Sequence, residues 1–380
     1  MKILIAPDKF KGSLSAIEVC DAIERGIKRF DSTIEIIKHP LADGGEGTLD
    51  ILNNHFKLET ISVLVKDPLF NDITATYKVS ENTAFIEMSN ASGLQLLNLN
   101  QRNCYYTSTF GTGQLILDAI KKGFKEIILF IGGSATNDAG IGMAAALGYC
   151  FYNLENQILN PIGKELINIS RIENENLFFD INEINFTVVC DVKNPLYGEN
   201  GAAYVYGKQK GASFEEIKLL DLGLQNFSNQ VLKYLNQSIA NNEGAGAAGG
   251  LGAGAICFLK AKIKSGIDFV IEQTQFKQHL NNKIDLIITG EGSVDKQTLE
   301  GKAVKGISDI STQYNIPYCI ISGITKDKGL VMQSLKPKSI KSVMELNVSF
   351  DDAIQNASKH IENIAFEIIK GLKENEDTIL

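Results

Sequence analysis

The chain contains 380 residues, of which 44% are hydrophobic and 22% are charged. These values are typical of a soluble globular protein, and the length is sufficient for two domains. The net charge of −8, from 37 Lys and Arg against 45 Asp and Glu, disfavours nucleic acid and anionic membranes as partners, because phosphate groups require clustered cations.

No segment approaches the roughly 20 consecutive apolar residues that a membrane-spanning helix needs. The sequence MKILIAPDKF has only a short apolar stretch before Pro7 and Asp8, which is not typical of a signal peptide. The six cysteines contain no CxxC pair, and several lie within apolar runs, so we expect reduced, buried thiols. We therefore predict a cytoplasmic protein.

The first residues predict alternating strands and helices. Residues 2–6 (KILIA) are typical of a short buried strand, and residues 15–18 (SAIE) form a capping box before apolar residues at helical spacing. Residues 33–39 predict a second strand, and residues 47–55 predict a second helix. This order is typical of an open, parallel α/β sheet.

The central part of the chain follows a different pattern. Three closely spaced strands within residues 61–89 predict an antiparallel meander. A helix over 114–123, the apolar strand KEIILFI and a strand over 186–192 follow. Near the C-terminus, strands separated by helices are expected over 284–290, 317–323 and 339–346, and Ser349 and Asp352 cap a long terminal helix.

These patterns predict two α/β domains. The first is discontinuous, with residues 1–60 and 283–380 around an open, mainly parallel sheet, and the second, residues 61–282, is inserted into it. Ligands of open α/β sheets bind beyond the carboxyl ends of the strands. We therefore expect the active site in a cleft between the two domains.

Several familiar motifs are absent or out of context. Gly244-x-Gly246-x-x-Gly249 matches GxGxxG, but a dinucleotide-binding loop must follow a strand, whereas NQSIANNE precedes this one. Two interpretations of Gly246 and Gly249 are therefore equally well supported: contact with phosphate, and close packing of small residues. No GxxxxGK[ST], HExxH or GxSxG sequence is present, which disfavours P-loop hydrolases, zinc hydrolases and α/β-hydrolases.

Acidic residues follow four of the predicted strands. Asp8, Asp43, Asp191 and Glu291 lie in the stretches APDKFKGS, LADGGEGT, CDVKNP and TGEGSVD, three of which also contain glycine. Phosphoryl transfer needs amides and cations around the phosphates, carboxylates that hold Mg²⁺, and a base near the acceptor hydroxyl. These residues therefore suit a phosphotransferase.

A glycine-rich loop, IGGSATNDAGIG (131–142), joins an apolar strand to a predicted helix. Amides at a helix N-terminus favour anions, so the phosphate-binding candidates are Gly132, Gly133, Ser134, Thr136 and Asn137. Asp138 is a candidate for holding a metal ion through water. The loop contains no lysine, so its cation would come from Lys11, Lys193 or Lys210.

Eight stretches are distributed along the chain: APDKFKGSLSA (6–16), LADGGEGT (41–48), GTGQLI (111–116), IGGSATNDAG (131–140), CDVKNPLYG (190–198), QKGA (209–212), GAGAAGGLG (244–252) and ITGEGSVDKQT (288–298). In this order the chain resembles, over nearly its whole length, the bacterial type of glycerate kinase that forms 2-phosphoglycerate. The resemblance implies two α/β domains and an ATP-dependent kinase that phosphorylates D-glycerate with Mg²⁺. The chain departs from the family pattern at Lys9, Phe110, Gln114 and Lys208, where the family commonly has Ser, Arg or Tyr, Glu, and Pro, respectively.

Within this family, the expected catalytic residues are Asp191, Lys11 and Asp8. Asp191 is the candidate base for the glycerate hydroxyl, or a metal ligand, with a turn-capping aspartate as the alternative. Lys11 is the first candidate for contacting the substrate carboxylate or the transferred phosphate. Asp8 is a candidate for a metal or hydroxyl contact.

Substrate binding is expected from Asp43, Lys210 and Arg102, because a guanidinium group can hold a carboxylate with two parallel hydrogen bonds. Glu291 and Asp295 join Asp138 as metal candidates, although helix capping is nearly as well supported for Asp295. Glu46 is a further candidate that could equally cap its helix. ATP and D-glycerate are the expected small-molecule partners, and the sequence does not predict an oligomeric state.

Two alternatives remain open. The first is a kinase for another small hydroxy acid, or one that forms 3-phosphoglycerate, because the four departures bear on substrate preference. The second is a catalytically silent sensor of a nucleotide or hydroxy acid. The full set of acidic residues at strand ends disfavours the sensor, since a protein without catalysis has no need of them.

Overall fold

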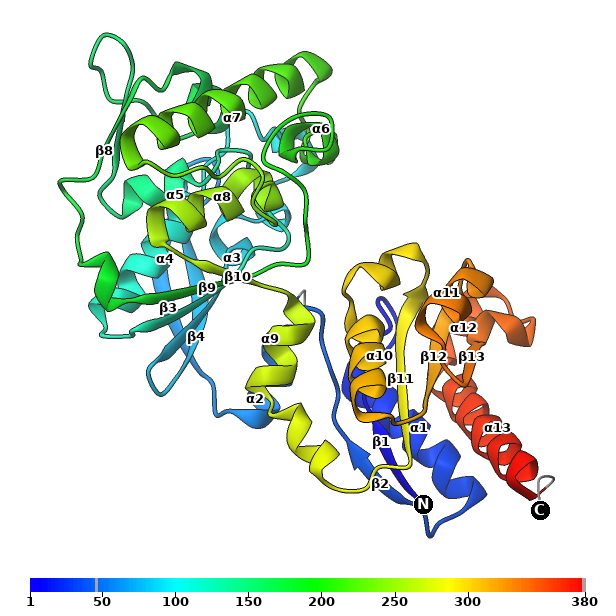
Figure 1. Cartoon of the computed structure of the whole chain (residues 1–380). Coiled ribbons are helices and arrows are strands. Elements are labelled where there is room, and N and C mark those ends of the chain that lie inside the picture. Colours follow the sequence, from blue (N-terminus) through cyan, green and yellow to red (C-terminus); the bar gives the residue numbers. More distant parts are fainter. Residues whose placement is uncertain (45–46, 378–380) are drawn as a thin grey trace. The chain divides into compact units, whose positions relative to one another are not determined.

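The computed structural model describes residues 1–44 and 47–377, and the chain forms two compact units (Figure 1). Met1–His55 and Ser265–Leu380 form the terminal unit, and Phe56–Lys264 form the inserted unit. The second boundary lies at residue 264 rather than at the expected 282. The reason is that α9 (Gly266–Gln273) contacts α2 (Thr48–His55), and a Cβ atom on Gly266 would lie 1.8 Å from the carbonyl oxygen of Asp43.

The terminal unit contains the expected open parallel sheet. Its strand order is β13-β12-β11-β1-β2, and every neighbouring pair is parallel. The strands are β1 (Lys2–Ile5), β2 (Glu35–Lys38), β11 (Leu286–Val294), β12 (Tyr318–Thr325) and β13 (Ser339–Ser342). The first and last parts of the chain thus form one sheet, because β1 lies between β11 and β2.

Helices α1 (Ala16–Phe30), α10 (Ala303–Tyr314), α11 (Lys328–Leu335), α12 (Phe350–Gln355) and α13 (Ala357–Asp377) complete this unit with α2 and α9. Ser15 and Glu18 form the expected capping box at the start of α1. The C-terminal segment forms two helices rather than the single helix expected from Ser349. Ser349 caps α12, and the chain leaves helical geometry at Asn356 before α13 begins.

Helices α1 and α13 cover a core of aliphatic side chains from β1, β11 and β12. A Cβ atom on Gly26 of α1 would lie 2.2 Å from the carbonyl oxygen of Glu362 on α13, so the two helices approach closely at this glycine. Arg25 and Arg29 both pair with the Glu362 carboxylate, at 3.2 and 2.8 Å. The long helix α13 therefore packs against the first helix, α1, and is held to it by these ion pairs.

The inserted unit contains a mixed sheet with strand order β10-β9-β6-β5-β4-β3. Its strands are β3 (Glu59–Lys66), β4 (Asp72–Ser80), β5 (Thr83–Glu87), β6 (Glu126–Phe130), β9 (Asn185–Val189) and β10 (Lys262–Lys264). β3, β4 and β5 form the expected antiparallel meander, and β5, β6, β9 and β10 are parallel. The carboxyl ends of β6 and β9 therefore lie side by side.

The remaining elements of this unit are α3 (Ser89–Ser92), α4 (Phe110–Lys121), α5 (Ile141–Ala146), α6 (Ala202–Tyr206), α7 (Phe214–Leu235), α8 (Ala247–Leu259) and an antiparallel pair, β7 (Cys150–Tyr152) and β8 (Arg171–Glu173). All six cysteines are free thiols; four are buried, and Cys150 and Cys190 are half-buried rather than buried as expected. In the part of the chain that the structure describes, no helix has both the length and the apolar character needed to cross a membrane.

Candidate active site

Acidic residues gather at the carboxyl edge of the sheet in the terminal unit. β1 runs parallel to both β11 and β2, so the ends of these three strands meet. The backbone N–H of Asp8, just after β1, donates to Gly290 O of β11 at 2.8 Å. Glu291 is the next residue of β11, and Asp43 follows β2. Three of the four expected acidic residues therefore lie at one edge of one sheet, and the fourth, Asp191, belongs to the inserted unit.

Asp8 and Glu291 are both buried, with 6% and 5% of their surfaces exposed. Burial raises the pKa of Asp8 to about 7, and the neighbouring carboxyl groups of Asp43 and Glu291 add to this effect. Burial also raises the pKa of Glu291 to about 7, against the opposing effects of a hydrogen bond from Thr298 and the charge of Lys302. A cation bound here would compensate the burial of both carboxylates.

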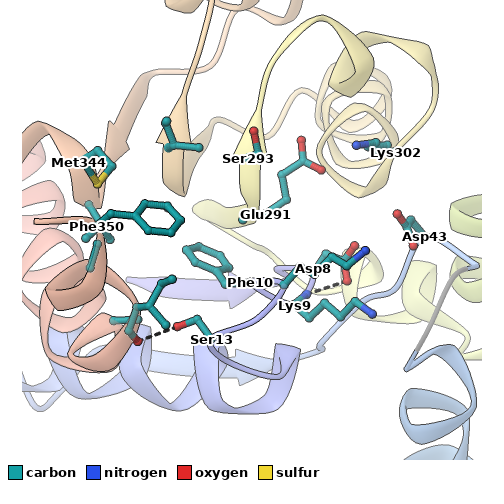
Figure 2. A pocket seen from close by; sticks show the side chains of 18 residues that line it. Asp8, Lys9, Phe10, Ser13, Asp43, Glu291, Ser293, Lys302, Met344 and Phe350 are labelled. Carbon is teal, nitrogen blue, oxygen red and sulfur yellow. Dashed lines mark hydrogen bonds between the residues drawn. The ribbon is translucent and has the colours of Figure 1, made fainter. Parts of the chain in front are cut away.

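These groups line a cavity of about 360 Å³. Figure 2 shows Asp8, Asp43 and Glu291 at one end of it, together with Lys9 and Lys302. The backbone N–H of Lys9 donates to the Asp8 carboxylate at 2.6 Å, and Lys11 is a further lining residue. The charged end therefore combines carboxylates, which suit a divalent cation, with lysines, which suit phosphate.

The carboxylate of Asp295, which follows β11, accepts a hydrogen bond from Ser293 Oγ at 3.4 Å, and its backbone N–H donates to Thr298 Oγ1 at 3.1 Å. These bonds place Asp295 in the turn that joins β11 to the following residues, and both its capping role and its metal role stay predictions. Across residues 1–44 and 47–377, no three His, Cys, Asp or Glu side chains form a metal-binding group. A magnesium ion needs only one or two protein carboxylates when phosphate and water complete its shell, and Asp8 and Glu291 fit that type of site. Glu46 lies outside the described residues.

The loop that follows β6 in the inserted unit is organised around Asp138. Its carboxylate is fully buried and accepts hydrogen bonds from Thr109 N (2.7 Å), Thr109 Oγ1 (2.8 Å), Gly140 N (3.2 Å) and Gly142 N (3.2 Å). Thr109 precedes α4, and the two glycines begin α5. Burial raises the pKa of Asp138, and these hydrogen bonds oppose the change. The oxygen atoms of Asp138 face N–H and O–H donors at the starts of two helices, which favours a capping role, and the expected metal role stays a prediction.

Lys210 supplies the cation that the loop lacks. Its Nζ donates to Ser134 Oγ at 2.6 Å and to Thr136 O at 2.8 Å. The side chain is buried, and burial lowers the pKa of the ammonium group to about 8. The other two candidates lie elsewhere, since Lys193 is exposed and 3.9 Å from a glutamate carboxylate, and Lys11 lines the cavity of the terminal unit.

Polar atoms of the same loop remain without a protein partner. Thr136 Oγ1 and both amide atoms of Asn137 are buried and make no hydrogen bond to any described residue. Buried polar atoms in proteins are normally paired, so such atoms indicate water or a ligand. Gly132 and Gly133 are exposed, and only Ser89 Cβ, at 3.4 Å, would approach a Cβ atom on Gly133. These four residues keep their place as candidates for ligand contact.

The second glycine-rich stretch has a different explanation. A Cβ atom on Gly246 would lie 2.2 Å from Pro195 O, and one on Gly249 would lie 2.0 Å from Thr136 O. Gly249 also has a φ of +71°, in the left-handed region. Close packing against neighbouring backbone therefore accounts for both glycines, and phosphate contact by them stays a prediction.

Asp191 and Arg102 occupy the same unit as the loop. Asp191 is half-buried and follows β9, two residues after Val189, which pairs with Phe130 at the end of β6. The register therefore places Asp191 level with Gly132 at the start of the loop. Arg102 donates from Nε to Leu97 O at 3.3 Å, and its segment packs against Lys210 and the following glycine.

The sequence reasoning missed Lys302, Thr298, Thr109, Phe10 and Phe350. Phe10 and Thr298 lie within two of the eight stretches, but nothing in those stretches indicates their contacts, and none of the eight contains Lys302, Thr109 or Phe350. At two of the departures from the family pattern the side chain itself makes the contact: Gln114 Oε1 accepts from Lys66 N at 2.7 Å, and the Phe110 ring lies 5.9 Å from the Phe70 ring.

A family model described as the glycerate kinase family matches residues 3–373. The chain is 40% identical over 370 residues to a glycerate kinase of Bacillus cereus, with 97% of each chain covered. It is 38% identical over 379 residues to the glycerate 2-kinase of Escherichia coli, covering 98% of this chain and 99% of the relative. A crystal structure of a candidate glycerate kinase 2 from Salmonella typhimurium LT2 matches with a TM-score of 0.85 and 36% identity over 99% of both chains. The resemblance of the eight stretches is thereby confirmed, and the chain belongs to the glycerate kinase family.

Proposed function

We propose that the protein transfers the γ-phosphoryl group of ATP to the 2-hydroxyl of D-glycerate, giving 2-phosphoglycerate and ADP. The single observation that carries the proposal is the group of buried carboxyls, Asp8 and Glu291, beside lysines in a cavity at the strand ends. Phosphoryl transfer depends mainly on positioning and on charge stabilisation. Relatives named glycerate kinase and glycerate 2-kinase supply the expected substrate.

In this proposal the terminal unit binds the metal and the phosphates. Asp8 and Glu291 would hold Mg²⁺, which would supply charge compensation for the phosphate oxygens. Lys11 and Lys302 contact phosphate oxygens, and Lys9 offsets the negative charge around Asp8.

In the inserted unit, the loop after β6 and Asp191 act on glycerate. Asp191 accepts the proton of the 2-hydroxyl as its oxygen bonds to the γ-phosphorus and the bond to ADP breaks. Asn137 and Thr136 have buried polar atoms available for the substrate, and Arg102 binds its carboxylate. Lys210 acts indirectly, because its ammonium group holds the loop through Ser134 and Thr136.

The test is ADP production from ATP and Mg²⁺ with D-glycerate and with a panel of other short hydroxy acids. D-glycerate should be the best acceptor, and Asp8→Asn and Asp191→Asn should each lower kcat by at least about 100-fold while the protein remains folded. Asp180→Asn, at an exposed cap of the inserted unit, is the matched control and should retain full turnover. Preference for another acid would replace the substrate, and ligand-induced stabilisation without ADP formation would support a sensor instead.

A further inference from the structure

One half of the cavity in the terminal unit has no use in binding glycerate or phosphate. Beyond the charged groups, its wall consists of Phe10, Ile324, Val343, Met344, Phe350 and Ile354. Figure 2 shows the rings of Phe10 and Phe350 at this end, away from Asp43 and Lys302. D-glycerate is a small acid with more oxygen than carbon, so an apolar wall offers it nothing.

The two aromatic rings differ in their surroundings. Phe10 is buried at 3% exposure and lies over Gly323, whose added Cβ atom would be 3.7 Å from the ring. Phe350, the first residue of α12, is 65% exposed although it is a large apolar side chain. One ring is therefore fixed in the protein core, and the other retains a free face that a ligand can cover.

The floor of the cavity is made of small residues. A Cβ atom on Gly292 would lie 3.2 Å from Lys11 N, and one on Gly323 would lie 2.7 Å from Gly292 O. Ala353 and Ala357 of the last two helices also line the cavity. Ser13 Oγ donates to Ile354 O at 3.0 Å and so links the loop after β1 to α12. Both glycines therefore pack closely against neighbouring backbone, and these four positions contribute only backbone atoms and methyl groups to the cavity lining.

We propose that this apolar half binds the adenine base of ATP against Phe350, with Phe10 as the inner wall, so that the triphosphate extends toward Lys302, Asp8 and Glu291. A flat apolar group joined to a polyanion is the chemistry that the two halves of the cavity require together. The cavity of about 360 Å³ lies in the usual range of small-molecule sites, roughly 300–1,000 Å³. The inference rests on the proposed function for the identity of the nucleotide, and it assigns the base to the terminal unit rather than to the glycine-rich stretch at 244–252.

The first test uses substitution of the exposed ring. Stacking of a base on an aromatic side chain is worth about 1–3 kcal/mol, so Phe350→Ala should raise KM for ATP and Kd for ADP by roughly 5- to 150-fold. KM for D-glycerate and inhibition by inorganic tripolyphosphate, which has no base, should not change. Phe214→Ala is the matched control, because Phe214 also follows a capping serine as the first residue of a helix and is 64% exposed.

The second test uses fluorescence. The chain contains no tryptophan, so Phe350→Trp introduces the only one. Addition of Mg²⁺ and ADP should change its emission, whereas tripolyphosphate should not, and Phe214→Trp should respond to neither. Ala353→Leu, which fills the apolar half without changing its polarity, should weaken ADP binding in calorimetry.

The experiments distinguish a wrong base site from a wrong proposed function. Normal D-glycerate turnover with unchanged KM for ATP in Phe350→Ala, and no response of Phe350→Trp to ADP, would overturn the base site and leave the kinase intact. A response of Phe350→Trp to ADP in a protein that does not phosphorylate D-glycerate would support the base site and reject the substrate.

Discussion

Replacement of Asp138 by alanine should destabilise the inserted unit without acting through a metal ion. The carboxylate has no exposed surface and accepts four hydrogen bonds, two of them at 2.7 and 2.8 Å. A buried donor without an acceptor costs about 1–3 kcal/mol. Water can enter the space that the side chain leaves, so the four costs do not add fully. We expect a loss of about 3–5 kcal/mol in the free energy of unfolding.

Asp138→Asn tests the charge of the side chain separately from its shape, because asparagine has nearly the same size as aspartate but no charge. The amide keeps one acceptor oxygen but directs an NH₂ group at N–H donors, so an intermediate loss of about 1–3 kcal/mol is expected. Asp180→Ala is the control, because Asp180 caps an exposed turn through Asn182 N, and a cap of this kind contributes about 1 kcal/mol.

The assay is urea denaturation in the presence of EDTA, with amide hydrogen exchange to locate the change. Exchange should accelerate at the first turns of α4 and α5, where the donors lie. If Asp138→Ala remained within about 1 kcal/mol of the unmodified protein but lost its dependence on Mg²⁺, the capping account would be wrong and the metal role would return.

Three further predictions concern protonation and packing. Glu291→Gln should raise the free energy of unfolding of the metal-free protein at pH 8 by up to roughly 3 kcal/mol, but not near pH 4.5. The reason is the raised pKa of Glu291, about 7. Protonated Glu291 stabilises the fold at low pH, and this effect is lost as the pH rises through 7. Urea midpoints at the two pH values test this, and a pH-independent difference would contradict it. Gly249→Ala should lower the free energy of unfolding by at least about 3 kcal/mol, because the new Cβ atom would lie 2.0 Å from a carbonyl oxygen. Gly12→Ala is the control: Gly12 has a φ of +77° but open space around it, so the loss should be only about 1 kcal/mol. His39 is buried, and its pKa is lowered to about 3, mainly by burial. In NMR spectra its ring resonances should therefore keep the shifts of neutral histidine as the pH falls from 6.5 to 5, and titration near 6.5 would refute the assignment. The contribution of neutral His39 to stability is full above pH 6.5 and is lost as the pH falls toward the folded pKa.

Much of the fold could be predicted because its signals are local. The parallel sheet of the terminal unit follows from apolar runs such as KILIA and IDLII, which end at glycine or acidic residues, and the meander follows from three short strands in succession. The boundary at 264 could not be predicted in the same way. Residues 266–281 show an ordinary helical pattern, and only tertiary contacts, with α2, α10 and His39, assign them to the terminal unit.

The candidate site was predictable where residues act from strand ends and was not where distant contacts decide. Asp8, Asp43 and Glu291 gather because parallel strands end at the same edge of the sheet. Asp138 looked like a metal ligand because its main partner, Thr109, is 29 residues away in the chain. Lys210 was one of three candidates for the loop's cation, since sequence spacing does not specify which lysine reaches a loop.

The measurement that tests the central claim most directly is phosphorus NMR of the purified protein with D-glycerate, ATP and Mg²⁺. The account predicts stoichiometric conversion to ADP and 2-phosphoglycerate, and loss of this conversion in Asp8→Asn. A 3-phosphoglycerate resonance would contradict the proposed acceptor hydroxyl, and an unchanged ATP spectrum with active control enzyme alongside would contradict the kinase itself.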